Sequence, residues 1–187
     1  MRCDHSDTIT AVNRGTKTDT YRMIDAEVLI TQEKGLALML LTADCLPTTL
    51  FDPVTQTLAL AHFSRQTIAD GLPAKLITYL NTHLNVHTEH LEVYVGPYIH
   101  KDSYCFPLPQ PELPTPIAAF AGKTDKKIYI DLPAAHNAQL IATGVQEKNI
   151  SYSLIDTVAS RDHFSHYQSK NENAPQGRIA TIAKLST

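Results

Sequence analysis

Two histidines and one cysteine are the residues of this sequence best suited to chemistry: His5, Cys45 and His62. Imidazole nitrogen and thiolate sulfur are donors that zinc and copper prefer in proteins. Three protein donors leave one coordination position open for water, which marks a catalytic rather than a structural centre. On spacing alone, a core thiol and two surface imidazoles would be the commoner arrangement. The metal centre is therefore a hypothesis that depends on what brings the three residues together.

The predicted strands around Cys45 and His62 are expected to bring these two residues together. A continuous apolar run over residues 36–42 predicts a strand buried on both faces. Residues 48–51 continue extended, an Asp-Pro pair then predicts a turn, and residues 57–62 predict the next strand. If this turn joins two antiparallel strands, Cys45 and His62 lie at the same end of the hairpin.

Strands and helices are interleaved along the rest of the chain. Apolar residues recur every three or four positions over residues 67–84, which predicts a helix, and the proline-rich stretch 106–116 is expected to be irregular. The other predicted elements are a strand start at 25–31, strands at 91–95, 127–131 and 178–183, an extended segment at 151–155, a helix at 132–144, and a loop or helical turn at 161–165. This order predicts one α/β (α+β) domain over residues 1–187, with a mixed central β-sheet flanked by helices.

The composition is that of a globular protein, with 43% hydrophobic and 19% charged residues. A formal net charge of −3 offers no basic surface for a phosphate backbone, so nucleic acid is not an expected partner. The apolar runs are too short to cross a bilayer and the N-terminus has no signal pattern, so we expect a soluble, cytoplasmic protein with no membrane partner. Three cysteines without dense spacing argue against a disulfide framework and suit a reducing compartment.

Short motifs in order along almost the whole chain resemble the YfiH-like family, also called the laccase-domain, multicopper polyphenol oxidase or purine nucleoside phosphorylase family. The most specific stretch is Thr42-Ala43-Asp44-Cys45-Leu46-Pro47, followed by Asp52-Pro53 and then by Ala61-His62. Shorter matches are weak singly, but their common order along the chain supports the resemblance. They are His5-Ser6-Asp7, Gly96-Pro97-Tyr98-Ile99, Asp131-Leu132, Phe164-Ser165 and Gly177-Arg178.

The resemblance implies a layered sandwich related to cysteine hydrolases and a metal bound by His5, Cys45 and His62. It implies an enzyme that acts on purine nucleosides: phosphorolysis of adenosine, inosine and methylthioadenosine, and deamination of adenosine. Zinc is the expected metal and copper the alternative, because the same donors suit both. A zinc ion with an open position lowers the pKa of bound water and supplies hydroxide for deamination. The expected partners are a purine nucleoside and phosphate, and the expected state is a monomer or small homo-oligomer.

The sequence departs from the family pattern where the family supplies arginines. The family's His-Ala-Gly-Trp-Arg-Gly stretch begins at His62 here and has Arg65 at the tryptophan position and Gln66 at the arginine position. The family's Phe-Ser-Tyr-Arg-Arg begins at Phe164 and Ser165, but both arginines are lost. Arginine holds phosphate through bidentate, charge-assisted hydrogen bonds, so we expect deamination to survive better than phosphorolysis. The sequence also begins at the first histidine motif, so the resemblance leads us to expect a domain that lacks the family's N-terminal segment.

The predicted substrate-binding residues are Arg65, Gln66, Phe164, Ser165 and Arg178. Of these, Arg65 and then Arg178 are the remaining candidates for phosphate. Whether Arg65 reaches the site depends on the backbone after the third ligand. In an extended chain its side chain would point to the opposite face, whereas in a turn it could still serve.

Three interpretations stay open at the level of the sequence. Asp44 is a candidate catalytic carboxylate that moves a proton or supports the thiolate. It is equally expected to be a turn or cap residue with no part in catalysis. The protein could instead be a cysteine hydrolase with Cys45 as nucleophile and His62 as base, or a degenerate metal-binding relative without turnover. Cys3 and Cys105 are expected to be dispensable, since Cys3 lies in the first, frayed turns and Cys105 stands where the family usually has an acidic residue.

Overall fold

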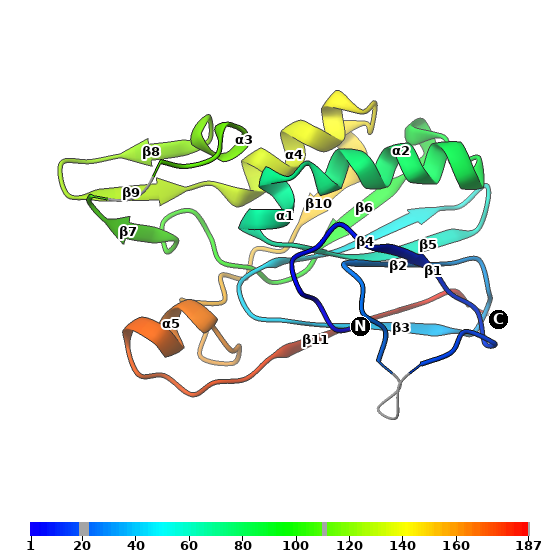
Figure 1. The fold of residues 1–187 in the computed structure, drawn as a ribbon, viewed down its shortest axis with the longest axis horizontal. Coiled ribbons are helices and arrows are strands. Elements are labelled where there is room, and N and C mark those ends of the chain that lie inside the picture. Colours follow the sequence, from blue (N-terminus) through cyan, green and yellow to red (C-terminus); the bar gives the residue numbers. More distant parts are fainter. Residues whose placement is uncertain (19–22, 110–111, 187) are drawn as a thin grey trace.

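A six-stranded mixed sheet forms the centre of the computed structural model, which describes residues 1–18, 23–109 and 112–186 (Figure 1). Its strands, in spatial order, are β1 (Ile9–Ala11), β2 (Val28–Thr31), β5 (Thr57–Phe63), β4 (Leu46–Asp52), β6 (Glu92–Val95) and β10 (Ile150–Tyr152). The outer pairs β1–β2 and β6–β10 are parallel, and the pairs between them are antiparallel. The predicted α/β class with a mixed sheet is confirmed.

Helices cover one face of this sheet (Figure 1): α1 (Arg65–Ala69), α2 (Leu72–Leu84) and α4 (Leu132–Ala142). Leu72, Leu76 and Leu80 form the buried face of α2 and belong to the main core between helices and sheet. The single helix predicted over residues 67–84 is in fact two helices. Gly71 breaks it because its φ of 76° lies in the left-handed region, which glycine adopts without steric cost.

A two-stranded sheet of β3 (Ala37–Thr42) and β11 (Ile179–Lys184) covers the other face and encloses a second core. The prediction of a strand buried on both faces at residues 36–42 is wrong. Leu38 and Leu40 are buried against the central sheet, whereas Met39 and Leu41 are 40% and 38% exposed. Since β3 pairs with β11 outside the central sheet, only its inner face meets another layer.

Two smaller units project from one end of the sheet in Figure 1. One is a three-stranded sheet of β7 (Cys105–Pro107), β9 (Lys127–Ile130) and β8 (Ala121–Lys123), with α3 (Thr115–Ala118) beside it, and the other is α5 (His166–Asn171). The proline-rich stretch 106–116 is therefore not wholly irregular: part of β7 and the start of α3 fall within it, while residues 110–111 lie outside the described ranges. The remaining short elements are the 3-10 helices η1 (Thr88–His90) and η2 (Glu147–Asn149).

The hairpin predicted around the Asp-Pro turn is confirmed. Strands β4 and β5 pair antiparallel from Asp52 opposite Thr57 to Leu46 opposite Phe63. Within the described ranges, no helix has the length and apolar character needed to cross a membrane.

Candidate active site

The β4–β5 hairpin places Cys45 beside His62. His62 pairs with Pro47 in the hairpin register, and Cys45 directly precedes β4 at the same end. Asp44 has a φ of 80°, so the chain turns sharply into the strand at this point. The contact between Cys45 and His62 that the hairpin predicts is therefore present.

His5 reaches the same place because the first residues of the chain are fastened to the segment that leads into β2. The backbone N–H groups of Asp4 and His5 donate to Oε1 of Glu27 over 2.8 and 2.7 Å. The His5 and His62 rings lie with their centroids 5.6 Å apart. All three predicted ligands thus meet at one end of the central sheet, although they come from three separate segments.

Glu27 is a residue beside the predicted ligands that sequence reasoning missed. Its side chain is fully buried, and its Oε2 lies 2.6 Å from Nδ1 of His62. A carboxylate in this position holds the proton on Nδ1, so Nε2 of His62 is left as the nitrogen that can bind a metal. The available signal was an acidic residue inside the otherwise apolar run 26–30, because a buried carboxylate requires a partner.

The electrostatics of the three predicted ligands are strongly coupled. Burial by itself raises the pKa of the Cys45 thiol, but hydrogen bonds from His5 and His62 outweigh it and lower that pKa. The bond to Cys45 raises the pKa of His5. Burial lowers the pKa of His62, whereas its contacts with Cys3, Cys45 and Glu27 raise it to about 12. The arrangement therefore stabilises a thiolate at Cys45, which is the form that binds metals.

A second set of metal-type donors shares His62 with the predicted triad. Among the described residues, the donor atoms of Cys3, Glu27 and His62 all lie within 4.8 Å of one another. The expectation that Cys3 lies in frayed turns is therefore wrong: its thiol is half-buried against His62. The imidazoles and thiols gathered here have the donor chemistry of a zinc or copper site.

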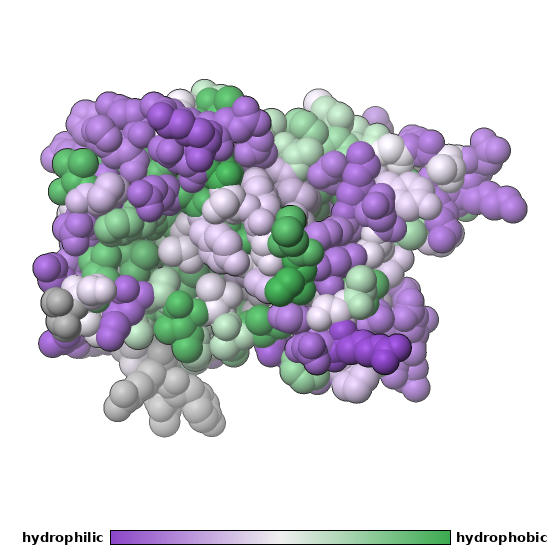
Figure 2. Space-filling model, turned by 180° about the vertical axis from the view of Figure 1, so that it is seen from behind, coloured by the Kyte–Doolittle hydropathy of each residue, from purple (hydrophilic) through white to green (hydrophobic). Residues whose placement is uncertain are grey.

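A cavity of about 520 Å³ opens beside the predicted ligands. His5 and Cys45 belong to its wall, as do Arg65 and residues of α5. Seen from behind, a recess separates the projecting β7–β9–β8 sheet from the region of α5 (Figure 2). The volume and the mixed lining suit a small-molecule ligand.

Three aromatic rings of the cavity pack edge to face. The centroid distances are 5.0 Å between Tyr104 and Phe106, 6.3 Å between Tyr104 and Tyr167, and 6.0 Å between Phe106 and Tyr167. The Arg65 guanidinium lies over the Phe106 ring, 5.6 Å from its centroid. Because β5 ends at Phe63 and α1 begins at Arg65, the chain turns here, and Arg65 lines the cavity.

Asp44 fastens the segment before and within α5 to the hairpin. Its carboxylate accepts hydrogen bonds from Thr157 Oγ1 (2.6 Å), Ser165 Oγ (3.1 Å) and the Tyr167 backbone N–H (2.6 Å). The side chain is 7% exposed. Of the two roles open from the sequence, this geometry favours the structural one, since three donors already occupy the carboxylate.

The other predicted substrate-binding residues lie in different places. Gln66 lines the cavity, but its amide nitrogen bonds to the carboxylate of Asp70 in the next turn. Ser165 is the N-cap of α5 and accepts from the Gln168 N–H. The remaining two predicted residues, Phe164 and Arg178, do not line the cavity. Phe164 packs over Gly177, and the Arg178 guanidinium donates to the Gly177 carbonyl. Lys170, which sequence reasoning missed, lines the cavity from α5.

Two residues that depart from the family pattern, Tyr167 and Cys105, contact each other. Tyr167, at a position where the family motif has arginine, donates its hydroxyl proton to the Cys105 carbonyl over 2.6 Å. Its hydroxyl oxygen lies 3.7 Å from the Cys105 sulfur, at the position where the family usually has an acidic residue. Tyr167 therefore presents an aromatic ring and a hydroxyl group, and no positive charge, at this position.

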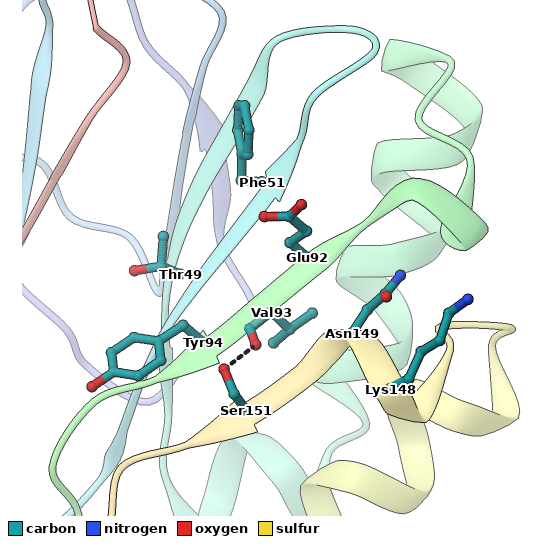
Figure 3. Close-up of a pocket in the computed structure, with 8 residues that line it drawn as sticks. All are labelled: Thr49, Phe51, Glu92, Val93, Tyr94, Lys148, Asn149 and Ser151. Atoms are coloured by element: carbon teal, nitrogen blue, oxygen red, sulfur yellow. Dashed lines mark hydrogen bonds between the residues drawn. The ribbon is translucent and has the colours of Figure 1, made fainter.

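A further hollow of about 470 Å³ lies over β4, β6 and β10, remote from these ligands (Figure 3). Its polar side chains include Glu92, Lys148 and Ser151, and Ser151 donates to the Val93 carbonyl over 3.3 Å. None of the eight residues that line it is a histidine or cysteine. This hollow therefore lacks the imidazole and thiol groups that line the cavity beside Cys45.

Known proteins similar to this chain carry names from nucleoside metabolism. The chain is 28% identical over 165 residues to Purine nucleoside phosphorylase ORF3 of Streptomyces griseus, in an alignment that covers 83% of this chain and 63% of that protein. It is 30% identical over 163 residues to Purine nucleoside phosphorylase SCO2081 of Streptomyces coelicolor, in an alignment that covers 82% of this chain and 62% of that protein. The chain thus spans less than two thirds of the length of these two relatives.

Solved structures share the fold over nearly the whole chain. The hypothetical protein YfiH of Bacillus licheniformis superposes with a TM-score of 0.83 at 21% identity, covering 97% of this chain and 72% of that one. YlmD from Geobacillus stearothermophilus also gives 0.83, at 24% identity, covering 98% of this chain and 72% of that one. Residues 1–186 match the family described as multi-copper polyphenol oxidoreductase laccase. The chain therefore belongs to this laccase-domain family, as its sequence motifs predict.

Proposed function

We propose that this protein is a metal-dependent enzyme that acts on purine nucleosides, with the metal bound by His5, Cys45 and His62. The observation that carries the proposal is that His5 and Cys45 line a 520 Å³ cavity and that the Cys45 thiolate is stabilised by both His5 and His62. The names of the relatives support the substrate class. Zinc is the proposed metal and copper the alternative, because imidazole and thiolate suit both.

The residues around the ligands have a defined part in this proposal. Glu27 keeps the proton on Nδ1 of His62, so Nε2 would be the atom that binds the metal. When bound, zinc with one open position lowers the pKa of water and supplies hydroxide near neutral pH, as deamination requires. Asp44 holds α5 against the cavity through Ser165 and Tyr167 and has no part in the proposed chemistry.

Other residues that line the cavity suit the substrate. The faces and edges of Tyr104, Phe106 and Tyr167 offer an apolar, aromatic surface on which a purine base can pack. Arg65 and Lys170 add two positive charges for a phosphate oxyanion. The retained metal ligands and the reduced number of arginines favour deamination of adenosine over phosphorolysis.

Metal analysis of purified protein, beside a chromatographic assay with adenosine in the presence and absence of phosphate, tests the proposal. We expect close to one metal per chain. The variants His5→Ala, Cys45→Ala and His62→Ala should each lose the metal and the activity, because one of three ligands is removed. Cys105→Ala, which changes a thiol near the cavity that is not a proposed ligand, is the matched control and should keep both. Full metal occupancy in Cys45→Ala would show that the ligand assignment is wrong.

The contact between Cys45 and His62 also supports a second candidate, a cysteine hydrolase with Cys45 as nucleophile and His62 as base. In its favour, hydrogen bonds from His5 and His62 lower the pKa of the Cys45 thiol, and the thiolate is the attacking form. Metal-free protein decides between the two. Activity that persists without metal and is abolished by a thiol alkylator would favour the hydrolase.

A further inference from the structure

The hydroxyl group of Tyr104 is a polar group of the cavity to which the proposed function gives no role. Tyr104 lines the cavity and directly precedes β7. The hydroxyl of Tyr167 donates to the Cys105 carbonyl, whereas no residue within the described ranges forms a hydrogen bond with the Tyr104 hydroxyl. A tyrosine hydroxyl can both donate and accept, and the few polar groups of an aromatic cavity fix the orientation of its ligand. The Tyr104 hydroxyl is therefore available to a ligand.

The position of Tyr104 is fixed by its backbone and by its ring. Its N–H lies 2.9 Å from the His100 carbonyl oxygen and 3.2 Å from that of Lys101, and its own carbonyl accepts from Ile130 N–H over 3.0 Å. Its ring packs edge to face against Phe106 at a centroid distance of 5.0 Å. A side chain held in this way loses little conformational freedom when a ligand binds to it.

The charges around Tyr104 place it close to both halves of the proposed chemistry. Burial raises the pKa of the Tyr104 phenol, the Arg65 charge lowers it, and the Cys45 charge raises it. The hydroxyl therefore carries its proton near neutral pH and can donate it in a hydrogen bond. Tyr104 is also within electrostatic reach of the thiolate proposed to bind the metal and of the cation proposed to bind phosphate. A nucleoside that reacts at either group has its base near this phenol.

The aromatic rings of the cavity determine which part of a base the Tyr104 hydroxyl can meet. The Arg65 guanidinium lies over the Phe106 ring, so Tyr167 offers the freer ring for stacking. The ring planes of Tyr104 and Tyr167 are inclined by 75°. A base that stacks parallel to Tyr167 is therefore steeply inclined to Tyr104, so it cannot stack on both rings. The Tyr104 hydroxyl is left to meet the edge of the base.

We propose that the Tyr104 hydroxyl donates a hydrogen bond to N7 of the bound purine base and thereby selects purine over pyrimidine nucleosides. This proposal rests on the proposed function for the substrate class. N7 is an acceptor in purine bases in general. N1, in contrast, accepts in adenine but carries a hydrogen in hypoxanthine, and pyrimidines have no imidazole ring and so no equivalent of N7. A donor at N7 thus suits a site that takes both adenosine and inosine.

Binding of inosine and 7-deazainosine to metal-loaded protein, measured by calorimetry in phosphate-free buffer, tests this assignment. Inosine is the product of deamination and is not phosphorolysed without phosphate, so binding is measured without turnover. Wild type should bind inosine about tenfold more tightly than 7-deazainosine, in which a C–H group replaces N7 and leaves the hydroxyl unpaired. Tyr104→Phe should bind the two nucleosides equally. Tyr94→Phe, which removes a hydroxyl from the remote hollow, is the matched control and should keep the tenfold preference.

The comparison of the two nucleosides on wild-type protein does not depend on the folding of any variant. Equal binding of inosine and 7-deazainosine by wild type would overturn the role of Tyr104 and leave the proposed function intact. A tenfold preference that persists in Tyr104→Phe would do the same. A metal-loaded wild-type protein that binds neither nucleoside would overturn both the role of Tyr104 and the proposed substrate class.

Discussion

Replacing Glu27 with glutamine is expected to weaken metal binding about tenfold to a hundredfold, the range found when a partner that orients a metal-bound histidine is lost. The carboxylate and the amide have nearly the same shape, so the buried volume is unchanged. The difference is chemical. With its oxygen accepting from the Asp4 and His5 N–H groups, the new amide would turn its NH2 group toward Nδ1 of His62. That donor forces the His62 proton onto Nε2 and blocks the proposed ligand atom.

The same change should also reduce the stability of the metal-free protein. All three hydrogen bonds of the buried group keep a partner, but each of them exchanges a charged carboxylate for a neutral amide. A loss of about 1 kcal/mol for each of the three weakened bonds gives a total of about 3 kcal/mol in the free energy of unfolding.

Competition with a chromophoric chelator measures the zinc affinity, and urea unfolding of metal-free protein measures the stability. Glu33→Gln is the matched control, because Glu33 is an acidic residue whose ion pair with Arg14 lies at the surface. We expect Glu33→Gln to change neither quantity appreciably. Zinc affinity in Glu27→Gln equal to that of wild type would refute the reasoning that Glu27 selects the His62 tautomer.

Three further predictions follow from single side chains. Asp44→Ala should lower the free energy of unfolding by about 2–3 kcal/mol and speed hydrogen exchange in α5, because three hydrogen bonds lose their acceptor. Asp44→Asn keeps an acceptor and should retain most of the activity. Equal inactivation of both variants would indicate that Asp44 transfers a proton. Burial lowers the pKa of His136 to about 3, well below its ordinary value in the unfolded chain. The unfolded chain therefore binds a proton first as the pH falls, so the free energy of unfolding should be unaffected by His136 above about pH 6.5 and should fall by up to about 1.4 kcal/mol per pH unit below it. Urea unfolding from pH 7 to 5 should show a smaller decrease in this free energy for His136→Gln than for wild type. Arg65→Ala should reduce phosphorolysis about tenfold to a hundredfold and spare deamination, measured as adenine and inosine release; phosphorolysis indifferent to this change would remove Arg65 from phosphate binding.

The local signals of the sequence are enough to predict most of the elements. The Asp-Pro turn and the strands on either side of it predict a hairpin with Cys45 and His62 at one end, and the register of β4 and β5 confirms it. Turn residues and apolar periodicity act over a few positions, so they can be read without knowing the fold. The same periodicity predicts one helix over residues 67–84 but misses the break at Gly71, because an isolated glycine is also tolerated inside helices.

The exposure of β3 illustrates what such signals leave open. Its residues form a continuous apolar run, which predicts burial on both faces. Whether another layer covers the outer face of β3 depends on the strand with which β3 pairs. That strand is β11, which lies more than a hundred residues away in the sequence. Met39 and Leu41 are exposed because that pairing forms a separate outer layer.

The sequence by itself determined the types of the ligands, the hairpin that joins two of them and the family to which the chain belongs. Only the tertiary structure decided what surrounds those ligands: Glu27 and Cys3 lie against His62, Arg65 faces the cavity, and Phe164 and Arg178 lie outside it. The physical reason is that a side chain's surroundings are set by contacts between segments distant in sequence. Cys3 reaches His62 because hydrogen bonds fasten its neighbours to residues 24–27, and no local pattern near residue 3 encodes that attachment.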